Sequence, residues 1–240
     1  MLELQNICFS AGGHEDILKD VSFTIPDDRF VVITGPNGGG KSTVARIIAG
    51  LQQPTSGKIL YNGEDITNKS ITERAKLGIS FAFQQPVRFK GITVRDLLEL
   101  ASGKKMDQNE DPCKYLVEVG LCAANYIDRE VNDSLSGGEI KRIEIAIALA
   151  RGAQLSIFDE PEAGIDLWSF RNLIGIFEHL QEELHGSILI ISHQERILNI
   201  ADDIIVLANG QVRKAGPREE VLPTLMYEES RAFCPKDKNN

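Results

Sequence analysis

The 240-residue sequence has no apolar run near the roughly 20 residues that a membrane-spanning helix needs, so we expect no direct membrane insertion. Its beginning, MLELQNICFS, lacks a basic start followed by an apolar stretch, and no secretory signal is predicted there. Basic residues are also in deficit: 26 Lys and Arg face 35 Asp and Glu, giving a formal net charge of −9. Such an acidic chain has no overall attraction to nucleic acid or anionic lipid and can bind phosphates only at a local site.

The four cysteines form no recognisable metal or disulfide pattern, because they include no Cys-x-x-Cys pair and have no nearby set of histidines. They are Cys8, Cys113, Cys122 and Cys234. This spacing argues against a disulfide framework, a zinc site and an iron–sulfur cluster held by the chain itself. We expect reduced thiols in a cytoplasmic protein. Apolar residues make up 42% and charged residues 25% of the chain, which is the balance of a globular protein.

The order of the apolar segments predicts an α/β fold. Phe30–Thr34, Leu155–Phe158 and Ser187–Ile191 are continuous apolar runs, which are typical of strands buried on both faces. A helical segment separates the last two, and this order indicates a parallel sheet. Further strands and hairpins are expected at 2–9, 21–25, 57–65 and 204–214, helices at 93–101 and 112–121, a solvated loop at 102–111 and a disordered tail after Pro235.

The strongest motif fits the phosphate-binding pattern G-x-x-x-x-G-K-S, which is called the P-loop. It consists of Gly35, Pro36, Asn37, Gly38, Gly39, Gly40, Lys41, Ser42 and Thr43. A strand precedes it and a segment with helical spacing follows, so successive backbone N–H groups and the positive end of the helix would face one anion. Lys41 would add a full charge at the β- and γ-phosphates, and the Ser42 hydroxyl would be a ligand of Mg²⁺.

Polar residues follow the two later buried strands. Asp159 and Glu160 come directly after Leu155–Phe158, and ligands gather at the carboxyl ends of parallel strands. We expect Asp159 to hold Mg²⁺ through a water molecule and Glu160 to polarise the water that attacks the γ-phosphate. His193 follows the next strand and is a candidate to contact the γ-phosphate and orient that water.

A second glycine-containing segment opens a helix at Leu135-Ser136-Gly137-Gly138-Glu139. Ser136 can cap this helix, and the N–H groups of Gly137 and Gly138 would then form a second anion site. Taken alone, a plain helix cap is the simpler interpretation.

The order of the motifs resembles the ATP-binding cassette (ABC) family: P-loop, Gln84 after an apolar strand, Leu-Ser-Gly-Gly-Glu, strand-Asp-Glu, Asp166 and strand-His. The resemblance covers essentially the whole chain. It implies a single ABC ATPase domain whose P-loop NTPase (RecA-like) core carries an N-terminal antiparallel β subdomain and an inserted helical subdomain. The core would comprise 1–83 and 136–222, the helical subdomain 84–135 and a C-terminal tail 223–240.

The resemblance also implies an ATPase that uses ATP and Mg²⁺ and works as an ATP-dependent homodimer. Two copies would associate head to tail, with each ATP between the P-loop of one copy and the Ser136–Glu139 signature of the other. Gln84 would reach Mg²⁺ and couple the site to a partner protein, while Asp166 would lie on the loop that crosses the dimer interface. Without ATP we expect a monomer or a weak dimer, since the two half-sites share the charge of one nucleotide.

Several residues resemble the Suf-type branch of the family (SufC-like), which drives an iron–sulfur cluster assembly scaffold. Ala11 stands where many transporter cassettes have an aromatic residue for adenine, and the signature ends in Glu139 instead of Gln. The run Phe83-Gln84-Gln85-Pro86-Val87 and the segment 159–166 also resemble that branch, although Pro161 is transporter-like.

Three functions stay open at this point. The chain could drive a Suf-type scaffold protein (SufB/SufD-like) that docks around Val87–Leu98, it could be the ATP-binding subunit of a membrane ABC transporter, or it could be a non-catalytic nucleotide-gated clamp. The clamp is disfavoured because the expected catalytic and metal-binding residues are all present: Lys41, Ser42, Asp159, Glu160 and His193. The other two functions differ only in the partner, and the local residues favour the scaffold.

Overall fold

The computed structural model describes residues 1–12, 15–85, 87–103, 113–183 and 186–232. Its strands are β1 (Leu2–Ala11), β2 (Glu15–Ile25), β3 (Phe30–Thr34), β4 (Ser56–Tyr61), β5 (Glu64–Asp65), β6 (Ile79–Ala82), β7 (Leu155–Asp159), β8 (Ser187–Ile191), β9 (Asp203–Ala208) and β10 (Gln211–Pro217). Its helices are α1 (Lys41–Ala49), α2 (Ile71–Lys76), α3 (Val94–Ser102), α4 (Cys113–Glu118), α5 (Ala123–Tyr126), α6 (Gly137–Arg151), α7 (Leu167–Glu183), α8 (Glu195–Ile200) and α9 (Arg218–Ala232).

Two sheets build the core of the fold. One is antiparallel with the order β2-β1-β4-β5, and the other has the order β10-β9-β3-β8-β7-β6. From β9 to β6 neighbouring strands of the second sheet are parallel, and β10 is an antiparallel edge strand. The predicted α/β fold with an N-terminal antiparallel sheet is therefore confirmed.

Strands β3, β7 and β8 are central, and every residue in them is buried. This burial is the reason for their continuous apolar sequences, since both faces of the sheet are covered. Because the strands are parallel, their carboxyl ends lie at one edge, where the residues that follow β3, β7 and β8 meet.

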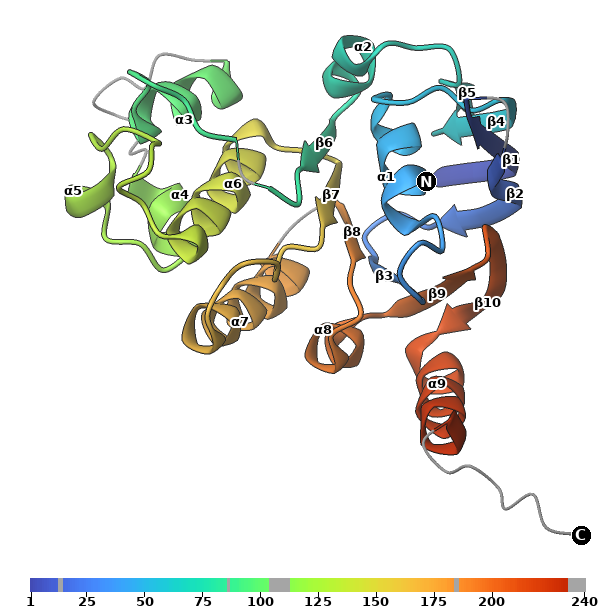
Figure 1. The fold of residues 1–240 in the computed structure, drawn as a ribbon. Helices are drawn as coiled ribbons and strands as arrows, with labels where there is room; N and C mark the ends of the chain where they lie inside the picture. Colours follow the sequence, from blue (N-terminus) through green and yellow to red (C-terminus); the bar gives the residue numbers. More distant parts are fainter. Residues whose placement is uncertain (13–14, 86, 104–112, 184–185, 233–240) are drawn as a thin grey trace, which may run out of the picture.

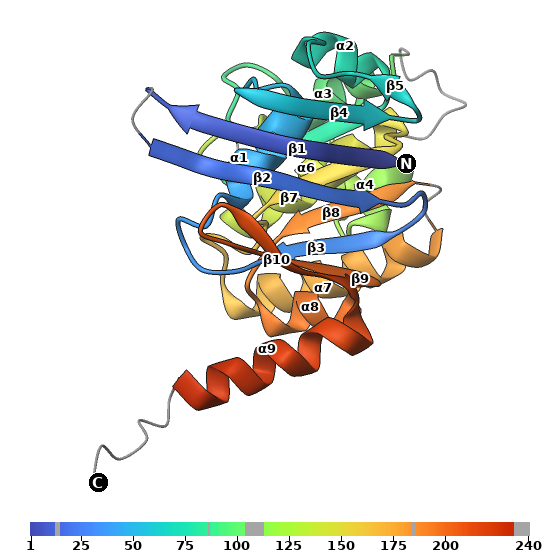
Figure 2. The same ribbon diagram turned by 90° about the vertical axis from the view of Figure 1, so that its right-hand side faces the viewer.

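Helix α1 lies between the two sheets, as Figure 2 shows behind the antiparallel strands. Val44, Ile47 and Ile48 are fully buried in a cluster that also contains residues of β1, β2, β3 and β8. The helical spacing of these side chains in the sequence thus reflects a helix with apolar partners on both sides.

The helical region that projects from the second sheet (Figure 1) contains α3, α4 and α5, all within 84–135. Helix α6 packs against α3 and α4, so this helix of the 136–222 segment is shared between the helical region and the core. The helix expected over 112–121 is shorter, Cys113–Glu118. The expected loop at 102–111 lies outside the described residues from position 104 onwards.

The expected start of the C-terminal tail, residue 223, lies inside α9. Val221 is fully buried, and Leu222 and Leu225 pack against the same core, which holds this helix on the body despite Pro223. Residues 233–240, which include Pro235 and the expected disordered end, lie outside the described residues. In the part of the chain that the structure describes, no helix combines the length and apolarity needed to cross a bilayer.

Candidate functional site

The P-loop joins the end of β3 to the start of α1, as predicted. Gly35 has a φ of 134°, and a Cβ atom there would lie 2.0 Å from the carbonyl oxygen of Leu207 in β9. No other residue fits this position, because the loop runs directly against the backbone of the neighbouring strand. The glycine therefore sets the path of the loop and brings its N–H groups to the carboxyl edge of the sheet.

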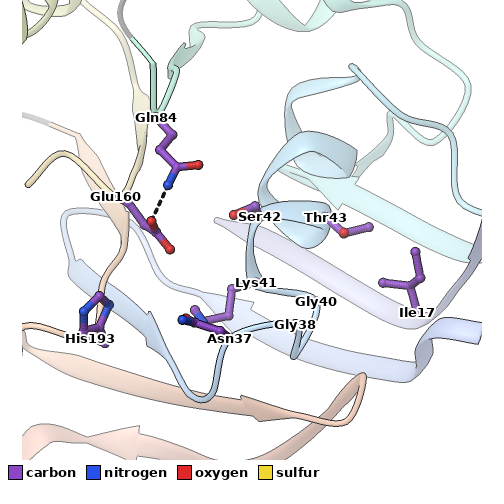
Figure 3. Close-up of a pocket in the computed structure, with 10 residues that line it drawn as sticks. All are labelled: Ile17, Asn37, Gly38, Gly40, Lys41, Ser42, Thr43, Gln84, Glu160 and His193. Carbon is purple, nitrogen blue, oxygen red and sulfur yellow. Dashed lines mark hydrogen bonds between the residues drawn. The ribbon is translucent and has the colours of Figure 1, made fainter. Parts of the chain in front are cut away.

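Lys41 is held by the loop that precedes it. The side chain is 5% exposed, and its Nζ donates hydrogen bonds to the carbonyl oxygens of Gly35 (2.8 Å) and Pro36 (3.0 Å). Burial lowers the pKa of Lys41, while the nearby charges of Glu160 and Asp159 act in the opposite direction. The ammonium group thus interacts with the charges of two carboxylates, and Figure 3 shows Lys41 among the residues that line the pocket.

Ser42 and Asp159, the residues expected to hold Mg²⁺, are in direct contact. Ser42 Oγ donates a hydrogen bond of 2.8 Å to Asp159 Oδ1, and Asp159 is 1% exposed. Burial raises the pKa of Asp159, and the Ser42 hydrogen bond opposes this shift. Among the described residues no group of three or more His, Cys, Asp or Glu could hold a metal ion. Two oxygen donors suit Mg²⁺ in particular, since this ion commonly binds one or two protein oxygens and completes its shell with substrate phosphates.

Glu160, the residue after Asp159, is in contact with Gln84. Gln84 Nε2 donates a hydrogen bond of 2.5 Å to Glu160 Oε2, drawn dashed in Figure 3. Glu160 has a φ of 45°, a left-handed conformation that is costly for a residue with a side chain and is concentrated at functional sites. Its N–H donates to the carbonyl oxygen of Ile191 (3.0 Å), so the end of β8 fixes the turn that carries the carboxylate.

Most of the residues predicted to bind the nucleotide phosphates and Mg²⁺ within one chain line a pocket of about 520 Å³. Its lining residues are Ile17, Asn37, Gly38, Gly40, Lys41, Ser42, Thr43, Gln84, Glu160 and His193. His193 and Ile17 lie at opposite ends of it (Figure 3). Ile17 was not predicted: it comes from β2 and is brought to the P-loop only by the packing of the antiparallel sheet. Ala11, the expected counterpart of an adenine-stacking aromatic, is exposed.

The signature segment forms the predicted helix cap. Ser136 Oγ accepts a hydrogen bond from the N–H of Glu139 (3.3 Å), and the Ser136 N–H donates to Glu139 Oε2 (2.6 Å). Tyr126 donates its hydroxyl to the other Glu139 oxygen. No residue of 136–139 lines the P-loop pocket, so within one chain the structure does not bring the two predicted anion sites together.

Asp166 caps helix α7 in the same manner. It accepts hydrogen bonds from the backbone N–H groups of Trp168 (2.9 Å) and Ser169 (3.0 Å) and from Ser169 Oγ (2.7 Å). These bonds, led by the one from the Ser169 hydroxyl, lower the pKa of Asp166. Asp166 likewise lies outside the P-loop pocket of its own chain.

A buried ion pair on α6 was missed by the sequence analysis. Lys141 Nζ lies 3.2 Å from Glu144 Oε2 and donates a hydrogen bond to the carbonyl oxygen of Phe83, the residue before Gln84. Glu144 also interacts with the backbone N–H of Val87, and burial raises the pKa of Glu144 although Lys141 opposes this. The pair therefore fastens both sides of the Gln84 loop to the helix that carries the signature. Pro86, within that loop, lies outside the described residues.

The comparisons with known proteins agree with this architecture. The family model described as ABC transporter matches residues 18–163, more than half of the chain. The chain belongs to the ABC ATPase family. It is 39% identical over 216 residues to an uncharacterized ABC transporter ATP-binding protein of Methanocaldococcus jannaschii, covering 87% of this chain and 86% of that one. A dimeric ATP-binding cassette bound to ADP and phosphate superposes with a TM-score of 0.80 at 26% identity, covering 91% of this chain and 99% of that one.

Two further relatives bear on the partner. A sulfate/thiosulfate import ATP-binding protein of Synechocystis sp. is 34% identical over 87% of this chain, which spans only 59% of that protein. A probable ATP-dependent transporter of Cyanophora paradoxa is 33% identical, covering 91% of this chain and 89% of that one. The chain is an ATPase that binds ATP with Mg²⁺. The names of these relatives point to transporters, and none of them refers to iron–sulfur cluster assembly.

Proposed function

We propose that the chain is the ATP-binding subunit of a membrane ABC transporter and that it hydrolyses MgATP as a head-to-tail homodimer. One observation carries the dimeric site: the P-loop pocket and the Ser136–Glu139 signature lie apart in a single chain. A second copy can complete the pocket, because the capped start of α6 offers a positive helix end to a nucleotide held elsewhere. Membership of a family whose cassettes form dimers supports this arrangement.

The residues of the pocket have separate roles in this proposal. The loop N–H groups and Lys41 bind the phosphates, while Ser42 and Asp159 hold Mg²⁺, which when bound neutralises phosphate charge. Glu160 accepts a proton from the attacking water, and His193 orients that water at the end of β8. Gln84, which donates to Glu160 in the structure, is placed to exchange this bond for contact with the nucleotide and its metal.

The test of catalysis is Glu160→Gln, which keeps the size of the side chain but removes its basicity. We expect turnover to fall by about 100-fold or more, the range typical of a general base. An ATP-bound dimer should accumulate and be visible by analytical ultracentrifugation. The matched control is Glu178→Gln, on the exposed face of α7, which should change neither quantity. Unchanged turnover in Glu160→Gln would remove Glu160 from the mechanism.

The transporter assignment is supported by the names of the relatives and by their lengths. The chain spans 86% and 89% of two relatives named as transporter components, so these similarities cover nearly whole proteins. The importer relative is longer, and its substrate is not carried over to this chain. As such a subunit the chain would lie on the cytoplasmic side and dock through its helical region, around Val87–Leu98.

A Suf-type scaffold is the second candidate partner, and specific residues favour it. Glu139, which stands where transporter signatures usually have glutamine, is bound by Tyr126. Ala11, where many transporter cassettes have an aromatic residue, is exposed and does not line the pocket. Affinity purification from native membranes and from the soluble fraction separates the two candidates. We expect a detergent-dependent complex with a polytopic membrane protein. A soluble complex that contains iron and sulfide would instead establish the scaffold.

A further inference from the structure

An exposed apolar pair stands at the start of α7. Leu167 is 69% exposed and Trp168 is 74% exposed, and Trp168 is the single tryptophan of the chain. A large aromatic side chain that is left in water costs free energy that burial against a partner would recover. Asp166 caps the helix directly before them, so the pair has a defined position on a rigid helix end.

This pair lies beside the signature. A Cβ atom on Gly138 would come within 2.5 Å of Ser169 Oγ, and one on Gly137 within 3.0 Å of the carbonyl oxygen of Gly164. The start of α7 therefore packs directly against the turn that opens α6. A protein surface that binds the Ser136–Glu139 signature therefore also lies next to Leu167 and Trp168.

A second hollow lies beside the P-loop pocket. Its volume is about 550 Å³, and it shares Asn37 and His193 with the nucleotide pocket. Its apolar lining comes from α8, β9 and α9, the elements at the lower right of Figure 1. The apolar side chains are Leu198, Val206, Leu222, Leu225 and Met226. Glu195 and Arg213 add charge to it, and Arg213 has no ion pair among the described residues.

We propose that in the ATP-bound homodimer Leu167 and Trp168 of one copy insert into this hollow of the other copy. The proposal rests on the head-to-tail dimer proposed above. In that dimer the signature of one copy faces the P-loop of the other, so the surface that flanks the signature meets the surface that flanks the P-loop. Both surfaces carry large apolar side chains. The hollow, with a volume of about 550 Å³, has room for an aromatic side chain, and such a side chain buries about 150–250 Å² of its surface. Glu195 supplies an acceptor for the indole N–H.

The contact gives the dimer a second source of affinity besides the shared nucleotide. Hot spots of protein interfaces are enriched in tryptophan that fills a desolvated pocket, whereas charges at the rim mainly affect the rate of association. Because two symmetric insertions form in each dimer, the effect of removing the anchor is doubled in free energy.

The single tryptophan makes the proposal directly measurable. In Glu160→Gln protein with MgATP, we expect the emission of Trp168 to shift to shorter wavelength and its quenching by acrylamide to fall severalfold. The same samples are examined by ultracentrifugation. A dimer in which Trp168 stays as quenchable as in the nucleotide-free protein would overturn this inference but leave the proposed function intact. Failure to dimerise at all would overturn both.

Variants give an independent measurement. Trp168→Ala should weaken ATP-dependent dimerisation by about 900-fold or more, because each dimer loses two hot spots of about 30-fold each, and Trp168→Phe should recover most of it. ATP affinity of the monomer should be unchanged, because Trp168 is exposed and keeps its backbone bond to Asp166. Leu100→Ala, 80% exposed on α3, is the matched control. If Trp168→Ala dimerises like the control, the pair serves another partner and the proposal is wrong.

Discussion

Replacement of Lys141 by methionine tests how the Gln84 loop is held. The substitution keeps the length of the side chain and removes its charge, in a position where the lysine side chain is 4% exposed and that of Glu144 is 16% exposed. It leaves the Glu144 carboxylate buried without its cation and the carbonyl oxygen of Phe83 without this donor. Breaking a buried ion pair by removing one partner costs about 3–5 kcal/mol.

The loss depends on pH in a direction that follows from Glu144. Burial already raises the pKa of Glu144 in the folded protein, and Lys141 opposes that shift, so its removal raises the pKa further. The folded state then binds more protons than the unfolded state. The stability lost through the buried Glu144 charge is therefore zero below the pKa of Glu144 in the unfolded chain, about 4.3, and complete above its pKa in the folded protein. Between these two values the free energy of unfolding of Lys141→Met falls as the pH rises.

Urea unfolding of four proteins measures the effect: the unchanged chain, Lys141→Met, Glu144→Gln and the double variant. At pH 8 we expect Lys141→Met to lose about 3 kcal/mol or more, at the lower end of the range for buried pairs. The double variant should recover about 2 kcal/mol of this, because the buried charge is gone, and Lys141→Met alone should be less damaging at pH 5. Additive losses that do not change with pH would show that the pair carries no coupling and refute this reasoning.

Two other predictions follow from buried polar groups. Arg74 is fully buried and donates hydrogen bonds to four backbone carbonyl oxygens, those of Ile47, Ile48, Thr67 and Lys69. Because lysine lacks the planar guanidinium group, Arg74→Lys should lower the free energy of unfolding in urea by about 2 kcal/mol or more. A loss below about 0.5 kcal/mol, the level of a surface change, would contradict this prediction. Removal of Mg²⁺ with a chelator should abolish hydrolysis, and Asp159→Asn should raise the Mg²⁺ concentration needed for half-maximal activity by about tenfold, as expected for the loss of one charged ligand interaction. An unaltered Mg²⁺ dependence would remove Asp159 from the metal site.

The sequence was sufficient where a local pattern determines the structure. Phe30–Thr34 is apolar throughout because both sheet faces are covered, and the loop that begins at Gly35 has a conformation that glycine alone permits. These local rules predicted the buried strands, the P-loop and the cap at Ser136, whereas the capping of α7 by Asp166 was not predicted. They also placed Ser42 and Asp159 together, since the carboxyl ends of parallel strands share one edge.

Features that depend on tertiary packing escaped the sequence analysis. Lys141 and Glu144 are three residues apart on α6 and have the spacing of a solvent-exposed helical pair, yet both are largely buried, and they contact the backbone of Phe83 and Val87. Ile17 is far from the P-loop in sequence and reaches it through the second sheet. Pro223 obscured α9, whose apolar side chains find their partners on the core only after folding.

The connection from Gln84 to α6 gives the chemistry of the pocket a physical route to the outer surface. Gln84 contacts Glu160 on one side, and its loop is fastened to α6 by Lys141 and Glu144 on the other. Helix α6 begins with the signature and packs against α3, the helix of the expected docking surface. If Gln84 exchanges its bond to Glu160 for a contact with the nucleotide, its loop moves and pulls on α6. This is the helix that a second copy and a docked protein would also contact. This arrangement would serve a permease or a scaffold equally well, and for that reason the choice of partner depends on the side chains exposed on α3 and in the loop before it.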